Sequence, residues 1–185
     1  MKACSFFGHR DTPQTEELKQ KVRETVERLI VDEGVDTFLF GSRSKFDELC
    51  HIVVTELKEK YPHIRRIAYL CKHEAGCLVG EDAMMKQQIK QLTGREVYVA
   101  EYEEIKKSDR VNSARRASYV KRNCEMINQS NYCIFYYNLR YYALNNKASE
   151  QNYGICQQSG GTRIAFEYAY RKISKEEIMQ VYNLA

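Results

Sequence analysis

The sequence has no apolar run that approaches the roughly 20 residues needed to span a bilayer. Its first residues also form no signal-peptide hydrophobic region. We therefore expect a cytoplasmic protein with no membrane partner. The seven cysteines include no CxxC pair, so reduced and mostly buried thiols are expected. Cys71, His73 and Cys77 fit no standard zinc spacing and lack a fourth ligand, so no metal site is predicted.

A strong excess of charge of one sign is also lacking. The chain carries 29 basic and 25 acidic residues, a net charge of +4. This small positive net charge does not indicate a nucleic-acid-binding surface, and we do not expect nucleic acid as a partner. The 185 residues are 43% hydrophobic, enough for one domain with a sizeable core. No internal repeat or low-complexity linker divides the chain, so residues 1–185 are expected to form a single domain.

Strand and helix patterns alternate along the chain, which predicts right-handed crossovers and an α/β fold with a mostly parallel sheet between two layers of helices. A helix is predicted to begin at Thr12 as its N-cap, with Pro13 at its first position, and to end near Asp32 before Gly34. Ser44 and Asp47 resemble a capping box at the start of a second helix. Strands are expected at residues 3–8, 36–41, 64–71, 96–100 and 131–138 and within 178–182, further helices at 81–91, at 114–129 and from Thr162, and a charged connection at 106–113.

The stretch Ser159-Gly160-Gly161-Thr162 reads as a glycine-rich turn that opens a helix, because an apolar-periodic run follows it directly. Such a turn presents unpaired backbone N–H groups, and the helix dipole adds partial positive charge there. Glycine lacks a Cβ, so an anionic ligand can approach the backbone closely. The alternative is a plain N-cap with Thr162 or Ser159 as the capping residue. The motif alone leaves both interpretations open.

Two further glycine turns follow predicted strands and carry an arginine each: Gly8-His9-Arg10 and Gly41-Ser42-Arg43. In an open parallel sheet, ligands bind beyond the carboxyl ends of the strands. We therefore expect all three turns to share one edge and to bind a phosphate group, since arginine binds phosphate oxygens bidentately. The alternative is that the glycines serve only tight strand-to-helix turns.

Several polar residues are candidates for the same edge. Arg122 and Asn123 lie near the end of a predicted helix and reach the edge from the side or remain on an exposed face. Asp47 and Glu167 are the carboxylates nearest the glycine turns and are the candidate catalytic residues, although Asp47 equally suits a helix cap. His9 is either a ligand contact or a structural hydrogen-bonder. Residues 139–158 are polar and aperiodic, and we expect them to form a lid over the site.

Several of these sequence motifs occur in an order that resembles the order of motifs in one known family. Ser5-Phe-Phe-Gly-His-Arg10, Phe38-Leu-Phe-Gly41 with Asp47, Tyr119 to Asn128, and Ser159-Gly-Gly-Thr162 with Tyr168-Ala169 resemble the YpsA-like branch of the SLOG superfamily. The resemblance implies a Rossmann-like fold that binds nucleotide-derived ligands and is distantly related to DprA and to the lonely-guy phosphoribohydrolases. It implies no cofactor, and a homodimer is expected by analogy with related folds. It makes these residues candidates for the ligand site: Gly8, His9, Arg10, Gly41, Ser42, Arg122, Asn123, Gly160, Gly161 and Thr162.

The chain departs from the hydrolase members of that family. Their signature PGGxGTxxE is absent. Ser159 replaces the proline side of that signature, and no glutamate lies three residues after Thr162. We therefore expect a module that binds, senses or sequesters a nucleotide-derived small molecule without turnover. A phosphoribohydrolase that uses Glu167 or Asp47 is the first alternative. The second is single-stranded nucleic-acid binding through Arg110, Arg115, Arg116, Lys121 and Arg122 with nearby tyrosines.

Overall fold

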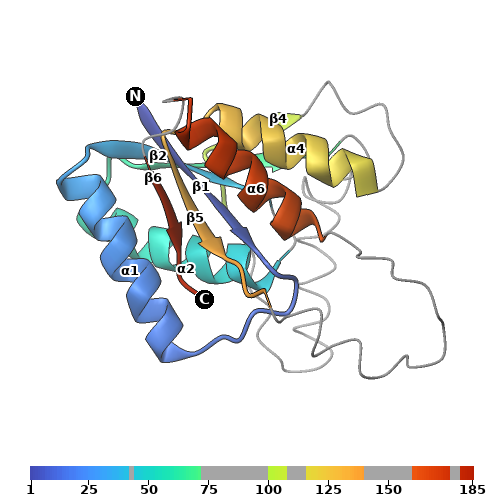
Figure 1. Cartoon of the computed structure of the whole chain (residues 1–185). Coiled ribbons are helices and arrows are strands. Elements are labelled where there is room, and N and C mark those ends of the chain that lie inside the picture. The colour runs from blue at the N-terminus through green and yellow to red at the C-terminus, as the bar shows by residue number, and fades with distance from the viewer. Residues whose placement is uncertain (42–43, 72–99, 108–115, 140–159, 176–179) are drawn as a thin grey trace, which may run out of the picture.

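A computed structural model describes residues 1–41, 44–71, 100–107, 116–139, 160–175 and 180–185. It contains one six-stranded sheet in the order β4-β3-β2-β1-β5-β6, in which every neighbouring pair is parallel. The expected α/β, Rossmann-like architecture is confirmed (Figure 1). The strands are β1 (Lys2–Gly8), β2 (Val35–Phe40), β3 (Arg65–Leu70), β4 (Glu104–Lys107), β5 (Tyr132–Tyr136) and β6 (Gln180–Asn183). The helices are α1 (Glu16–Val31), α2 (Lys45–Lys60), α4 (Arg116–Asn128) and α6 (Gly161–Ile173).

Two helices cover each face of the sheet (Figure 1). Alternate residues of β1 serve the two faces: Phe6 packs in the core under α1 and α2, and Phe7 packs in the core under α4 and α6. Because both faces are covered, the central strands read as continuous apolar runs. This pattern is why β1, β2, β3 and β5 were predictable from the sequence. Among the described residues, no helix combines the length and the apolar character that a membrane crossing requires.

Three predicted details are wrong, each for a local reason. Helix α1 begins at Glu16, because the Thr15 hydroxyl accepts a hydrogen bond from the Leu18 N–H at 3.2 Å, whereas the Thr12 hydroxyl donates to the carbonyl of His9. Strand β4 lies at Glu104–Lys107, partly within the predicted charged connection, and its edge position tolerates charged side chains. The predicted strand at 96–100 and helix at 81–91 lie almost wholly outside the described residues.

The third error concerns the buried face of α4. The apolar spacing of this helix predicts a buried line through Ala117, Val120, Cys124 and Ile127. Ile127 is buried, but Ala117 is exposed, and the buried face also carries Ser118, Arg122 and Met126. Apolar periodicity misses Ser118 and Arg122 because both are polar. The same helix therefore brings a buried arginine to the sheet.

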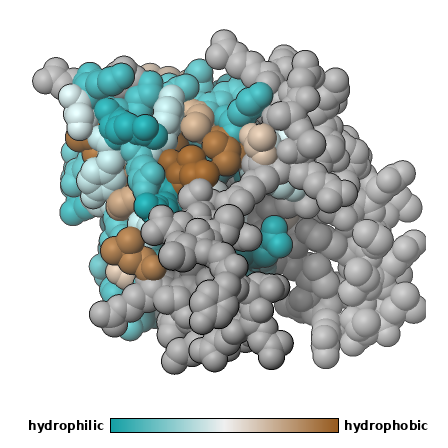
Figure 2. All heavy atoms as spheres, turned by 45° about the vertical axis from the view of Figure 1, so that its right-hand side comes forward, coloured by the Kyte–Doolittle hydropathy of each residue, from teal (hydrophilic) through white to brown (hydrophobic). Residues whose placement is uncertain are grey.

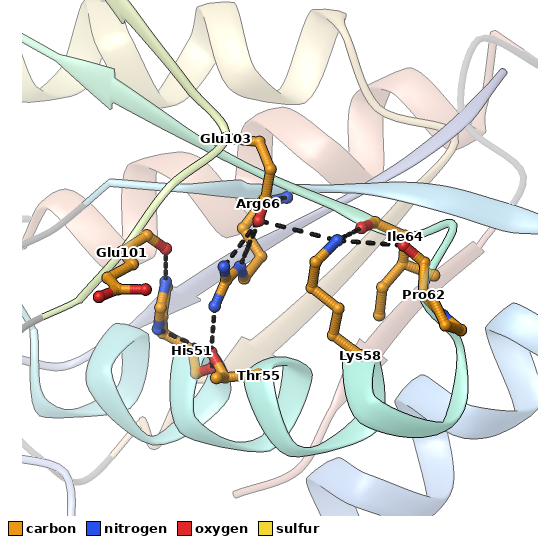
Figure 3. Close-up of polar contacts among 8 residues, drawn as sticks. All are labelled: His51, Thr55, Lys58, Pro62, Ile64, Arg66, Glu101 and Glu103. Atoms are coloured by element: carbon orange, nitrogen blue, oxygen red, sulfur yellow. Dashed lines mark hydrogen bonds and ion pairs between the residues drawn. The ribbon is translucent and has the colours of Figure 1, made fainter.

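An ion-pair network fastens the segment before β4 to β3 and α2 (Figure 3). Arg66 is 7% exposed, and its Nη2 donates to Oε1 of Glu103 at 2.6 Å while its Nη1 donates to Thr55 at 2.8 Å. The Arg66 backbone N–H also donates to the Glu103 carboxylate. Lys58 adds a second cation 3.7 Å from Glu103. Although burial opposes it, hydrogen bonding and the charge of Arg66 lower the pKa of Glu103 to about 2.

A buried histidine extends this network (Figure 3). Nε2 of His51 donates to the carbonyl of Glu101 at 2.8 Å, so the ring is held neutral with its proton on Nε2. The ring also packs edge-on against Phe40 and Tyr102. Burial lowers the pKa of His51 to about 4, and the Arg66 cation contributes to the lowering.

We predict that acid weakens the fold through these two groups. His51 takes up a proton near pH 6.5 when unfolded but only near pH 4 when folded. The stabilisation is therefore complete above pH 6.5 and is lost as the pH falls to about 4, on the order of 3 kcal/mol. Glu103 adds a further loss as the pH falls from 4.5 towards 2. The free energy of unfolding, measured by urea denaturation between pH 3.5 and 7.5, checks this. The His51→Gln variant should lack the loss between pH 6.5 and 4, and a control His63→Gln, at an exposed position, should keep it.

Candidate functional site

The carboxyl ends of β1, β2 and β5 and the first turns of α2 and α6 meet at one edge of the sheet. The Thr162 hydroxyl, in the first turn of α6, donates to the carbonyl of Gly8 at 2.9 Å. The Lys45 N–H, at the start of α2, donates to the carbonyl of Arg10 at 3.0 Å. Thus the turns at Gly8–Arg10 and Gly160–Thr162 share an edge, as predicted from the sequence. From β1 the chain passes first to β2 on one side and later to β5 on the other, so this edge includes the topological switch point.

The first turn of α6 is the part of the edge that is open to a ligand. Gly160 is the N-cap, and no side chain within the described ranges makes a capping hydrogen bond to the helix. Thr162 is one of the predicted N-cap residues, but its hydroxyl instead donates a hydrogen bond to the carbonyl of Gly8. A Cβ built on Gly161 would have no described atom within 4 Å. The first N–H groups of α6 therefore lack a side-chain acceptor from the described residues and carry the positive end of the helix dipole.

At Gly8 and Gly41, close packing of neighbouring side chains explains why the residue is glycine. A Cβ on Gly8 would overlap the Cβ of Phe46, a fully buried residue of α2. A Cβ on Gly41 would lie 2.8 Å from Nη2 of Arg122. Side chains of the protein itself fill these corners, so the two glycines allow close packing, a reason that the sequence analysis did not consider. Of Gly8, Gly41 and Gly161, the last is the one where a Cβ would meet no described atom within 4 Å.

A buried charge pair lies beneath the Gly41 corner. Arg122 is 5% exposed and Asp47 is 8% exposed, and they come from α4 and α2. The Asp47 N–H donates to the Ser44 hydroxyl at 3.0 Å, and the Asp47 carboxylate accepts from the Ser44 backbone N–H, as the predicted capping box requires. The Ser44 hydroxyl also donates to the Asp47 carboxylate at 3.1 Å. Burial raises the pKa of Asp47, and the charge of Arg122 and the hydrogen bonds only partly offset it. Arg122 therefore reaches the edge from the side.

His9 has a structural role. It is 2% exposed, and its Nε2 accepts a hydrogen bond from the Asn138 N–H at 3.0 Å. Its carbonyl accepts from Thr12 at 2.8 Å. Burial lowers the pKa of His9, in keeping with a neutral ring that accepts at Nε2. The residue fixes the end of β1 against the end of β5.

The remaining predicted site residues either have other partners or lie outside the described residues. Glu167 pairs with Arg163 at 2.7 Å on the exposed side of α6, and Asn123 accepts a hydrogen bond from Arg122 at 3.3 Å. The catalytic roles of Asp47 and Glu167 stay predictions. Ser42, Arg43 and Ser159 lie outside the described residues, as does the predicted lid apart from Leu139. The described residues contain no group of three or more His, Cys, Asp or Glu side chains arranged for a metal ion.

Sequence reasoning missed a row of aromatic rings that leads away from this edge along α6. Tyr137, just beyond β5, lies 4.8 Å from Phe166 between ring centroids, and Phe166 lies 4.7 Å from Tyr170. Phe166 and Tyr170 are four residues apart and so share one face of the helix. That spacing was visible in the sequence and is the signal that would have found them.

The comparisons with known proteins found a similarity among solved structures. No protein-family model matches the chain, and no curated protein matches it in sequence. Among solved structures, the chain is similar to DNA processing protein A from Helicobacter pylori, described as binding single-stranded DNA. The two share 16% identity over 97% of this chain and 74% of the other, with a TM-score of 0.45. The SLOG resemblance and its YpsA-like branch stay predictions.

The expectation that nucleic acid is not a partner is contradicted, since the matched protein binds single-stranded DNA. It was based on the net charge of +4, which averages over the whole chain. The described part of α6 instead concentrates basic side chains, with Arg163, Arg171 and Lys172 against the single acidic residue Glu167. We withdraw that expectation.

We predict that the glycines of this edge differ in their tolerance of alanine. Gly8→Ala should lower the free energy of unfolding by about 1–3 kcal/mol, because a methyl group there overpacks against Phe46. Gly161→Ala should leave it unchanged or raise it by up to about 1 kcal/mol, because the site has room and alanine favours the helix. Urea denaturation at pH 7 measures both. Equal losses in the two variants would contradict this account of the edge.

Proposed function

We propose that this protein binds a nucleotide-derived ligand at the carboxyl edge of its sheet, through a phosphate group at the first turn of α6. The observation that carries the proposal is the junction of Thr162 with Gly8. It fixes the start of α6 against the switch point of the sheet, and among the described residues no side chain caps this start and no atom lies near a Cβ placed on Gly161. Backbone N–H groups and the helix dipole favour an anion at such a place.

The charges around the edge support a phosphate ligand. Arg10 is exposed directly beyond β1, and its backbone is held by the start of α2. Arg122 is held beneath the Gly41 corner with Asp47 as a neighbouring carboxylate. An arginine at the rim offers a planar pair of donors that matches phosphate oxygens. A ligand with its phosphate at Gly160–Gly161 has its base on the side of Tyr137, a ring held 5.8 Å from that of His9.

The proposed activity is binding without turnover. Glu167 is engaged by Arg163 on the outer side of α6, and Asp47 is buried with Ser44 as its hydrogen-bond partner. A phosphoribohydrolase needs a carboxylate that faces the ribose, and both candidates have other partners. These contacts favour binding or sequestration over hydrolysis.

We predict that the purified protein binds nucleoside mono- and diphosphates, such as AMP, GMP and ADP, and does not bind the parent nucleosides. Gly161→Ala should weaken phosphate-dependent binding about tenfold or more, because the methyl group keeps a phosphate away from the backbone. Isothermal titration calorimetry measures both effects. Ser174→Ala, at the other end of α6, is the matched control and should bind as the wild type does.

Two results would overturn the proposal. One is equal binding by the wild type and Gly161→Ala, which would move the ligand away from α6. The other is release of free base from a nucleoside monophosphate, followed by chromatography over hours, which would replace binding with hydrolysis.

A further inference from the structure

Two consecutive residues at the end of β1 join this strand to its neighbours. The carbonyl of Gly8 accepts the Thr162 hydroxyl at the start of α6. Nε2 of His9 accepts the N–H of Asn138, just beyond β5, at 3.0 Å. The Gly8 carbonyl and the backbone nitrogen of His9 belong to one planar peptide group. A movement of His9 therefore turns the acceptor that positions α6 and its phosphate site.

A second side chain also holds the chain just beyond β5. Oδ1 of Asn183 accepts the Tyr137 N–H at 2.9 Å, and Nδ2 of Asn183 donates to the Tyr137 carbonyl at 3.0 Å. A side-chain amide does not titrate, so these two hydrogen bonds do not depend on pH. The hydrogen bond between His9 and Asn138 differs, because an imidazole takes up a proton near neutral pH.

The geometry fixes the protonation state in which His9 makes its hydrogen bond. A backbone N–H only donates, so Nε2 must present a lone pair to Asn138, and the ring must be neutral. A protonated ring carries an N–H at both nitrogens, and two donors would then face each other. Because His9 is 2% exposed, the cation would also lack hydration. Protonation of His9 therefore breaks its hydrogen bond to Asn138.

The groups around this corner include both signs of charge. Tyr137 lies against the His9 ring, 5.8 Å away between ring centroids, and a phenol offers no ion pair to a cation. The charged residues of the adjoining elements are Arg10 and Asp11 of the same turn, Lys45 of α2, and Arg163 and Glu167 of α6. Asp11 lies 4.0 Å from Lys45, and Glu167 lies 2.7 Å from Arg163, so each carboxylate has a cation beside it. Burial outweighs these charges and lowers the pKa of His9 from its ordinary value of 6.5.

We propose that the hydrogen bond between His9 and Asn138 makes the phosphate site sensitive to pH. A neutral ring holds the end of β1 to the chain beyond β5 and keeps the Gly8 carbonyl in place for Thr162. A protonated ring leaves Asn138, and the start of α6 loses its alignment with β1. The inference rests on the proposed function, because it concerns the regulation of the same site.

The direction of the effect follows from the lowered pKa. The site is intact above pH 6.5 and is lost as the pH falls through the lowered pKa of His9. Figure 2, in which the right-hand side of Figure 1 is turned forward, shows a largely hydrophilic surface with small apolar patches on the described residues. A protonated ring regains its hydration by moving out of the interior toward such a surface.

Isothermal titration calorimetry with ADP at pH 7.5 and at pH 5.0 tests this proposal. The terminal phosphate of ADP itself takes up a proton at roughly pH 6, so the wild type is compared with His9→Gln. The glutamine amide oxygen accepts the Asn138 N–H and does not titrate. Between the two pH values the wild type should lose about five- to tenfold more affinity than His9→Gln, because one linked proton separates them. His63→Gln, at an exposed position, is the matched control and should lose as much affinity as the wild type.

Nuclear magnetic resonance of the wild type gives a second measurement that needs no variant to fold. The ring signals of His9 and the amide signal of Asn138 should titrate together, in one step below pH 6.5. If the His9 ring titrates while the Asn138 amide signal stays unchanged, the proposed pH sensitivity is wrong.

The outcomes separate this inference from the proposed function. Equal losses of affinity in the wild type and His9→Gln, or a smaller loss in the wild type, overturn the role of His9 and leave the nucleotide site in place. Absence of ADP binding at pH 7.5 rejects the proposed function and this inference with it. If His9→Gln does not fold, the Asn138 amide signal decides.

Discussion

The absence of a side chain at Gly8 is the constraint on which the functional edge depends. Because Gly8 has no Cβ, Phe46 of α2 packs directly against the end of β1 from one face of the sheet. The carbonyl of the same residue accepts the Thr162 hydroxyl from α6 on the other face. One residue therefore sets the positions of two helix starts relative to the central strand. A side chain there would separate α2 from β1 and shift the carbonyl that orients α6.

This constraint divides the three glycine turns into two kinds. At Gly8 and Gly41 the space is taken by Phe46 and Arg122, so these glycines serve packing. At Gly161 no atom of the described part of the chain fills the space, and none of its side chains caps the helix start beside it. The sequence motifs alone do not distinguish the three turns. Of the three, the turn at Gly161 is the one where a ligand can reach the backbone at the positive end of a helix dipole. The candidate site is thus smaller than the sequence suggested and lies closer to α6.

Much of the fold was predictable because strands covered on both faces are mainly apolar, and α1 carries a regular apolar stripe that includes Leu18, Val22 and Val26. The predictions failed where charged or polar side chains lie in strands or on buried helix faces. Strand β4 is charged because it lies at an edge, and its Glu104 pairs with Arg65 of β3 at 3.1 Å. The inward face of α4 contains Arg122, which periodicity assigns to solvent. Burial of such a side chain is a tertiary property, set by the pocket that Gly41 leaves for it.

The same reasoning explains why the site was predictable only in part. That strand ends gather at one edge follows from parallel topology, which the sequence indicates. Whether an arginine or an aromatic ring faces that edge depends on helix rotation, which the sequence indicates only weakly when a helix has polar residues on both sides. In α6 the buried positions Ala165 and Ala169 are small, so the helix lies close to the sheet. Phe166 packs edge-on against Phe135 in the core, and Tyr170 beyond it is exposed. Which of these rings reaches solvent is thus set by how α6 lies on β5, a tertiary contact that the spacing of the residues does not give.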